Sequence, residues 1–318
     1  MKTTNENHWA SQKEISQGYA HFKLMLFIVK HLPVLCMKLC AFPVSFFYFI
    51  FAKKARRESQ RFLNKIKITL PLKKKLSSYK HFLSFSLSLV DKLVAWSSKI
   101  VISDLIFCGD DSASLIERLE NNQGALVICS HLGNVEVLRA RSSIGKTNVS
   151  HHFPVVSIVD FSVTENFNRL LKELNPSSML HLINAYEINP GTITELEETL
   201  LQGGLVVIAG DRVSAETGTR TFEFPFLGQN AQWSEGPFYL ASLLKVPVYF
   251  VFALRKKDIS LHSKYTMHTH KSTIEFSGER RKRKEQVQEL ARSFVKILEY
   301  YTKEHPYQWY NFYDFWRE

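Results

Sequence analysis

His131 and Glu136 are the two residues whose types and spacing could do chemistry, in the run His-Leu-Gly-Asn-Val-Glu. A carboxylate that holds one imidazole nitrogen raises the basicity of the ring, and the other nitrogen can then take a proton from an alcohol. Residues five apart on a continuous helix point roughly 140° away from each other. The pair can therefore meet only if the chain bends, which Gly133 permits. We expect His131 to be a general base that Glu136 orients, for acyl transfer to a hydroxyl without a covalent enzyme intermediate.

The element that must position this pair is the unbroken apolar run at residues 125–129. Such a run is typical of a buried strand in a parallel sheet that helices cover on both faces. Chemistry in open α/β sheets lies at the carboxyl ends of the strands. Residues 135–141 read as a helix, so His131 falls in the strand-to-helix turn and Glu136 in the first turns of the helix. The alternative is a histidine that caps a helix and a glutamate on its solvent face.

A second apolar run, residues 205–209, also ends in polar residues, Gly210-Asp211-Arg212. Carboxyl ends of neighbouring parallel strands meet at one edge of a sheet. We therefore expect Asp211 and Arg212 to face His131 and to position the substrate or the developing oxyanion. The alternative is a turn that carries an exposed ion pair.

Residues 131–136 resemble the His-x4-Asp/Glu motif of the lysophospholipid acyltransferase superfamily. The chain looks most like the branch that contains the bacterial lipid A late acyltransferases (lauroyl and myristoyl transferases). Three further stretches match that branch in order: the Asp211 segment, the phenylalanine-rich residues 222–229, and His-Pro-Tyr-Gln-Trp at residues 305–309. The branch often has Ala where this chain has Gly210 and Gln where it has Arg212, which indicates a different acceptor or donor.

The resemblance implies an α/β fold like that of glycerol-3-phosphate acyltransferase: a mostly parallel sheet with helices on both faces and an apolar membrane anchor at the N-terminus. It implies transfer of a fatty acyl chain from acyl carrier protein or acyl-coenzyme A to a hydroxyl of a membrane glycolipid or lipid A-like acceptor. No metal and no organic cofactor are implied. Besides Asp211 and Arg212, the expected substrate-binding residues are Gly133, Asn134, Arg139 and Phe226. Arg139, like Arg141, could bind phosphate.

The expected anchor lies within residues 22–52, which are strongly apolar but contain Lys23, Lys30, Lys38, Pro33 and Pro43. The longest uncharged run, residues 39–52, is shorter than the about 20 residues that a spanning helix needs. A span therefore requires Lys30 or Lys38 to reach toward the interface. An interfacial or re-entrant anchor fits at least as well, and a buried soluble hairpin is the alternative.

The formal net charge of +11 is concentrated in residues 53–80, which follow this apolar segment. A basic run beside an apolar anchor is attracted to anionic headgroups and favours a cytoplasmic location for the rest of the chain. This predicts a bacterial inner-membrane protein with its catalytic domain on the cytoplasmic side. Nucleic acid is the competing partner, but no nucleic-acid fold motif is present. A second basic cluster, residues 280–284, could dock the acidic acyl carrier protein or be a solvated helix start.

The chain thus divides into an N-terminal tail and anchor (1–52), a basic juxtamembrane segment (53–80) and an acyltransferase domain (81–318). The four cysteines form no metal-spaced set, and apolar packing is their expected role. Serine 112 or 114 is the expected cap of the helix that precedes the first apolar strand. Further helices are expected at 79–100, 110–122, 164–174, 192–201, 235–244 and 280–303, and further strands at 153–159 and 246–253.

Three other functions stay open. A lysophospholipid acyltransferase differs only in its acceptor. A serine hydrolase would use Ser130 beside His131, although the Gly-x-Ser-x-Gly turn of such enzymes is missing. A non-catalytic lipid-binding membrane protein on the same fold is the third.

Overall fold

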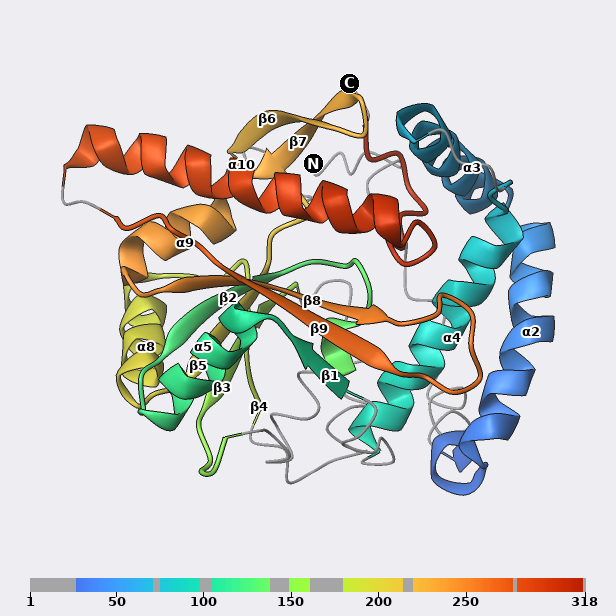
Figure 1. Ribbon diagram of the computed structural model, residues 1–318, viewed down its shortest axis with the longest axis horizontal. Helices are drawn as coiled ribbons and strands as arrows, with labels where there is room; N and C mark the ends of the chain where they lie inside the picture. Colours follow the sequence, from blue (N-terminus) through green and yellow to red (C-terminus); the bar gives the residue numbers. More distant parts are fainter. Residues whose placement is uncertain are drawn as a thin grey trace.

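The computed structural model describes residues 27–70, 75–97, 105–137, 149–160, 180–213, 220–276 and 279–316. At its centre is a seven-stranded sheet with the order β1-β9-β8-β2-β5-β3-β4 (Figure 1). These strands are β1 (Leu105–Cys108), β2 (Ala125–Cys129), β3 (Val155–Val159), β4 (Leu180–Asn184), β5 (Leu205–Ala209), β8 (Val248–Arg255) and β9 (Tyr265–Lys271).

The sheet is mostly parallel, as the sequence predicts. Strand β2 pairs in parallel with β5 on one side and β8 on the other, with Ile128 opposite Ile208. The exception is β9, which runs antiparallel to β8 and carries β1 on its other side. Because β2, β5 and β8 are parallel neighbours, the segments after Cys129, Ala209 and Arg255 all leave the sheet at one edge.

Helices cover both faces of the sheet because its strands are apolar on both sides. Leu126 and Ile128 of β2 pack into one core, whereas Ala125 and Val127 pack into the other. The first core is closed by helices α8 (Pro190–Leu201), α9 (Gly236–Leu244) and α10 (Arg280–Glu304). The second core is closed by α5 (Asp110–Glu120), through Leu115 and Leu119.

A separate two-stranded hairpin, β6 (Thr221–Phe226) and β7 (Gln229–Ser234), lies beside α10 (Figure 1). Phe226 and Trp233 from this hairpin pack against Trp309, Phe315 and Trp316 of the C-terminal segment. The aromatic residues that the sequence shares with the lipid A branch therefore form one cluster.

In the part of the chain that the structure describes, the sheet is preceded by the helices α2 (Val34–Phe51), α3 (Lys53–Thr69) and α4 (Ser78–Trp96). Among the described residues, α2 is the one helix that is long and apolar enough to cross a membrane, with a mean hydropathy of 2.0 over 18 residues. The helix continues through Pro43 and includes Lys38.

Some expectations differ from the structure. Neither Ser112 nor Ser114 caps α5, whose N-cap is Gly109, and the Ser112 hydroxyl instead donates to the Cys108 carbonyl. Cys36 and Cys40 are exposed on α2 rather than packed. Strands β1, β4 and β9 were not expected from their sequences. The helix expected at 164–174 lies outside the described residues.

Candidate active site

His131 and Asp211 meet at the carboxyl edge of the sheet, where β2 and β5 end side by side. The Nδ1 atom of His131 lies 2.8 Å from Oδ1 of Asp211. The backbone N–H of His131 also donates to Oδ2 of the same carboxylate, at 2.8 Å. The Asp211 side chain, 1% exposed, is thus bound to His131 through both of its oxygens.

This contact fixes the chemical state of the imidazole. A carboxylate can only accept hydrogen bonds, so Nδ1 carries the proton and Nε2 keeps its lone pair. The His131 side chain is 41% exposed, whereas its partner is buried. The ring is therefore partly exposed while its Nδ1 is held by a buried carboxylate.

The charges around the pair keep His131 neutral and Asp211 ionised. Loss of hydration around the ring lowers the pKa of His131, and the nearby Arg212 guanidinium lowers it further, against the opposing influence of Asp211. Burial alone raises the pKa of Asp211, but the charge and hydrogen bond of His131, together with Arg212, hold that pKa below its ordinary value. The pair suits proton abstraction by the histidine.

The turn that carries His131 uses all of its backbone N–H groups internally. His131 donates to Asp211, and Leu132 donates to the Ser130 hydroxyl at 3.2 Å. Gly133 donates to the carbonyl of Gln308, and Asn134 donates to the carbonyl of Ala253. Backbone groups of this turn are therefore not available to bind an oxyanion.

Gly133 is required at its position by backbone geometry. Its φ of +76° lies in the left-handed region, where side chains are disfavoured. A Cβ atom there would lie 2.1 Å from the carbonyl oxygen of Ala253 on β8. Gly133 therefore permits the bend that the sequence predicts, and it allows the turn to approach β8.

Asn134 connects the turn to a buried charged cluster. Its side-chain amide donates to the carbonyl of Ser88 at 3.1 Å and to the Tyr265 hydroxyl at 3.3 Å. That hydroxyl donates to Asp91 at 2.6 Å, and Asp91 also pairs with buried Arg255. We expected Asn134 to bind substrate; in the structure it is 2% exposed and ties the turn to α4 and β9.

The C-terminal segment holds the other side of the turn, a role that sequence reasoning missed. Leu132 and Trp309 form an isolated antiparallel bridge. The Gln308 side chain accepts from the N–H of Arg255 and donates to its carbonyl. The match of residues 305–309 to the lipid A branch was the available signal.

The remaining predicted site residues lie as follows. Glu136 is 9% exposed, in the helical residues 135–137, and its pairing with His131 stays a prediction. Arg212 lies with its guanidinium 5.7 Å from the centre of the Tyr313 ring. Phe226 is fully buried, and its ring packs against that of Trp309. Arg139 and Arg141 lie outside the described residues.

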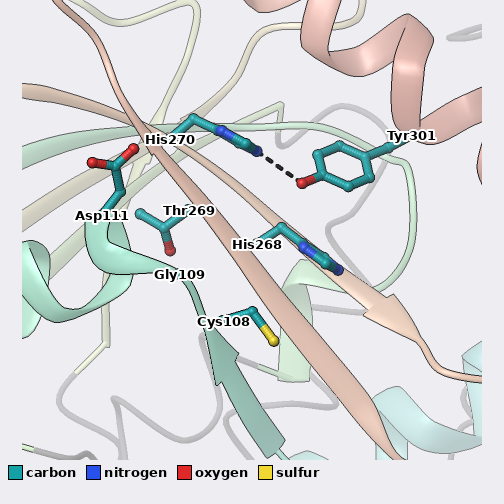
Figure 2. Close-up of a pocket in the computed structure, with 7 residues that line it drawn as sticks. All are labelled: Cys108, Gly109, Asp111, His268, Thr269, His270 and Tyr301. Carbon is teal, nitrogen blue, oxygen red and sulfur yellow. Dashed lines mark hydrogen bonds between the residues drawn. The ribbon is translucent and has the colours of Figure 1, made fainter.

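A pocket of about 380 Å³ lies elsewhere, on β1, β9 and α10 (Figure 2). Its lining includes His268 and His270, and His270 is hydrogen-bonded to the Tyr301 hydroxyl at 2.8 Å. Burial lowers the pKa of both histidines and raises that of Tyr301 to about 12. These groups are therefore neutral at pH 7, and none of the predicted site residues lines the pocket.

The family model for bacterial lipid A biosynthesis acyltransferases matches residues 92–318, which is well over half of the chain. The chain belongs to this family. A comparison with curated proteins finds no match. The protein is therefore an acyltransferase that acts on a lipid-like acceptor, and the predicted fold class and branch are confirmed. The match covers the acyltransferase's sheet, the His131 turn and the C-terminal segment, so a purely lipid-binding protein is disfavoured.

Proposed function

We propose that this acyltransferase moves a fatty acyl chain from an acyl thioester to a hydroxyl of a membrane glycolipid or lipid A-like acceptor, with His131 as the general base. The observation that carries the proposal is a histidine side chain that is 41% exposed and whose Nδ1 is bonded to a buried carboxylate, which leaves Nε2 as the basic nitrogen. It lies at the carboxyl end of two neighbouring parallel strands, where such sheets bind their ligands.

The proposed reaction has two steps. Nε2 of His131 takes the proton of the acceptor hydroxyl while the hydroxyl oxygen attacks the thioester carbonyl, so that a C–O bond forms. When the tetrahedral intermediate collapses, the C–S bond breaks and the leaving thiolate receives the proton from the imidazolium. Asp211 stabilises the imidazolium between these steps and keeps the ring in one tautomer.

We assign stabilisation of the oxyanion to Arg212. The turn amides from residue 131 to residue 134 are already hydrogen-bonded within the protein. Arg212 follows Asp211 directly, and its charge acts on both members of the pair. A cation fixed near the reacting carbonyl stabilises negative charge as it develops.

The serine hydrolase alternative is disfavoured by the position of Ser130. Its side chain is buried, and its hydroxyl oxygen accepts the Leu132 N–H. His131, its neighbour, is bonded to Asp211 through Nδ1. A nucleophilic serine needs both access and a base within hydrogen-bond reach.

Donor, acceptor and location remain part of the proposal. Acyl carrier protein and coenzyme A are both anionic carriers of an acyl thioester, and the exposed Lys282 at the start of α10 suits either. A lysophospholipid is the alternative acceptor. The family's lipid chemistry and the apolar helix α2 support a place at the bacterial inner membrane, with the catalytic domain on the cytoplasmic side.

Three variants test the assignment of the base and its partner. His131→Ala should abolish transfer, and Asp211→Asn should lower kcat by about 100-fold or more, because general acid–base catalysis typically contributes 10²–10⁴-fold and depends here on the tautomer that Asp211 holds. Glu136→Gln distinguishes the two carboxylates. If Glu136→Gln is as damaging as His131→Ala while Asp211→Asn stays active, the local carboxylate is the partner and our assignment to Asp211 is wrong. Circular dichroism and thermal unfolding establish that each variant is folded.

Mass spectrometry of lipid extracts from the native host identifies the acceptor. Cells with the protein should contain a glycolipid heavier by one acyl chain than the same lipid in cells with His131→Ala. A gain confined to a phospholipid that replaces its lyso form would instead favour the lysophospholipid alternative. An unchanged lipidome in the native host would contradict both.

A further inference from the structure

Helix α2 has two sides of different character. Met37, Lys38, Ala41 and Ser45 are buried against the rest of the protein. At 100° per residue, the exposed apolar residues cover about half of the helix circumference, on the other side. These residues are Leu35, Leu39, Val44, Phe46, Phe47, Ile50 and Phe51. An apolar surface of this extent indicates an apolar partner.

The buried side is docked along its whole length onto α4, which runs beside it (Figure 1). Near the start of α2, Met37 shares a small core with Val94. In the middle, Ala41 packs with Leu83 and Leu87. Near its end, Phe49 packs edge-on against Phe82 on α4, with ring centres 5.7 Å apart. The helix is therefore part of the folded domain.

Lys38 makes this docking specific. Its ammonium lies 3.0 Å from Asp91, with a side chain that is 4% exposed. It also donates to the carbonyl of Leu261 and the hydroxyl of Ser263, both at 2.8 Å. A helix that left the domain to cross a bilayer would carry this lysine into hydrocarbon, at a cost of about 3 kcal/mol. It would also remove a cation from a buried carboxylate.

The helix that follows, α3, adds positive charge next to the apolar surface. Its buried side includes Phe62 and Ile66 and also Glu58. Its solvent side carries Lys53, Arg57 and Arg61; both arginines pair with Glu58, and their side chains are still 63% and 55% exposed. Basic residues beside an apolar surface attract anionic headgroups, by about 1 kcal/mol each.

We propose that α2 lies in the plane of the membrane and does not span it. Its exposed apolar side, Leu35 to Phe51, enters one leaflet of anionic phospholipid, while α3 contacts the headgroups and Lys38 keeps the helix on the domain. This arrangement places the catalytic domain against the membrane surface. It holds for any lipid acceptor, so it is independent of the proposed function.

Depth measurements on the full-length protein test this proposal directly. Cys36 and Cys40 lie on the exposed side of α2. A fluorophore is attached at Cys36 in a Cys40→Ser background, or at Ile50→Cys in a background that lacks both native cysteines of α2. Each protein is bound to phosphatidylglycerol vesicles whose acyl chains are brominated at shallow or deep positions. We expect both labels to be quenched at the same shallow depth, about 5–10 Å below the headgroups.

A spanning helix gives a different result. Residues 36 and 50 would then be separated by about 21 Å along the membrane normal, at 1.5 Å per residue. A Val44→Cys label would be deepest, and an impermeant thiol reagent would reach positions 36 and 50 from opposite sides of the vesicle. That pattern, or the absence of quenching at both positions, would overturn the proposal.

Two leucine variants provide a matched comparison. Leu39 is 50% exposed on α2, and Leu201 is 84% exposed at the end of α8. Leu39→Glu should weaken binding to phosphatidylglycerol vesicles by at least about tenfold, because it replaces an apolar side chain that enters the leaflet with a charged one. Leu201→Glu should leave binding unchanged. Equal affinities for the two variants would exclude α2 as the membrane-binding surface.

Discussion

The imidazole of His131 lies between two charges with opposite effects. Asp211 favours the protonated ring and Arg212 disfavours it, and with the loss of hydration the net result is a lowered pKa. Each neighbour therefore shifts the pH at which His131, the proposed base, becomes neutral. Replacing Asp211 should therefore shift the pH dependence of activity in one direction, and replacing Arg212 should shift it in the other.

Replacing Arg212 with Gln should move the acid limb of log kcat/KM to higher pH. A general base works only when neutral, and removal of a nearby cation raises the pKa of His131. The dependence of kcat/KM on pH between 5 and 8 checks this, since its acid limb reports the pKa of the base in the free enzyme. The Asp211→Asn variant should show the opposite shift on its residual activity, because it removes the group that raises the pKa. Identical profiles for wild type and Arg212→Gln would mean that Arg212 does not act on the base.

The residues of the site show what could be predicted and what could not. His131 and the bend at Gly133 follow from local sequence, since both depend on a strand that ends in a turn. We also expected Asp211 to face His131, because both follow buried strands. We assigned the orienting role to Glu136, five residues away, whereas the Nδ1 contact in the structure comes from Asp211, 80 residues away. That contact depends on which strands are neighbours in the sheet.

His81 on α4 joins three elements that surround the active site. Its Nε2 donates to the carbonyl of Trp309 at 3.0 Å, and its Nδ1 accepts from Ser59 on α3 at 2.9 Å. Burial lowers the pKa of His81 from 6.5 to about 4, despite the Trp309 carbonyl, which opposes that effect. Trp309 also forms a β-bridge with Leu132. The protonation state of His81 therefore affects the segment that holds the His131 turn.

The protein should lose stability as the pH falls from about 6.5 to about 4. The folded state keeps His81 neutral, so the unfolded chain binds more protons in this range and unfolding is favoured by about 3 kcal/mol at the lower limit. Urea unfolding at pH 7 and pH 4.5 measures the change. In His81→Gln, which keeps a donor and an acceptor but does not titrate, the dependence should be smaller. An equal loss in both proteins would assign the effect to other groups.

Long apolar elements were predictable, and short or mixed ones were not. Strands β2, β5 and β8 are continuous apolar runs, and α8 and α9 lie where the sequence predicts helices at 192–201 and 235–244. Strand β9 alternates buried apolar or small residues with His268 and His270, which hide its strand character. Strand β1 has only four residues. The sequence predicts which segments form strands more clearly than it predicts the position of each strand in the sheet or the strands beside it.

For the molecule as a whole, the buried cluster around Asp91 joins the apolar helix, the sheet and the active-site turn. Burial alone raises the pKa of Asp91, but Arg255 and Lys38 outweigh it and hold the pKa below its ordinary value. The carboxylate is thus ionised and paired on two sides. Its other contact, Tyr265, reaches Asn134 in the turn.

Lys38→Met should lower the free energy of unfolding by about 2 kcal/mol, the typical value for a buried hydrogen bond to a charged group. Asp91 would retain Arg255 but lose its second cation. The same change at Lys53, which is exposed at the start of α3, is the matched control and should have little effect. Denaturant unfolding of wild type and both variants, all in one detergent, measures these changes in the free energy of unfolding. Equal stabilities would show that the Lys38 pair is not a structural contact.

The bridge between Leu132 and Trp309 has a consequence for how the enzyme is made. A ribosome synthesises His131 about 180 residues before Trp309, so at 5–20 residues per second roughly 10–40 s separate them. Until residues 248–255 are made β2 lacks β8, and until residue 308 is made the turn lacks Gln308 as an acceptor. If α2 and α3 bind the membrane as proposed, the nascent chain can reach it before the proposed base is in place. We therefore expect acyl transfer to begin only when the final segment has folded back onto the turn, and an incomplete chain at the membrane to be inactive.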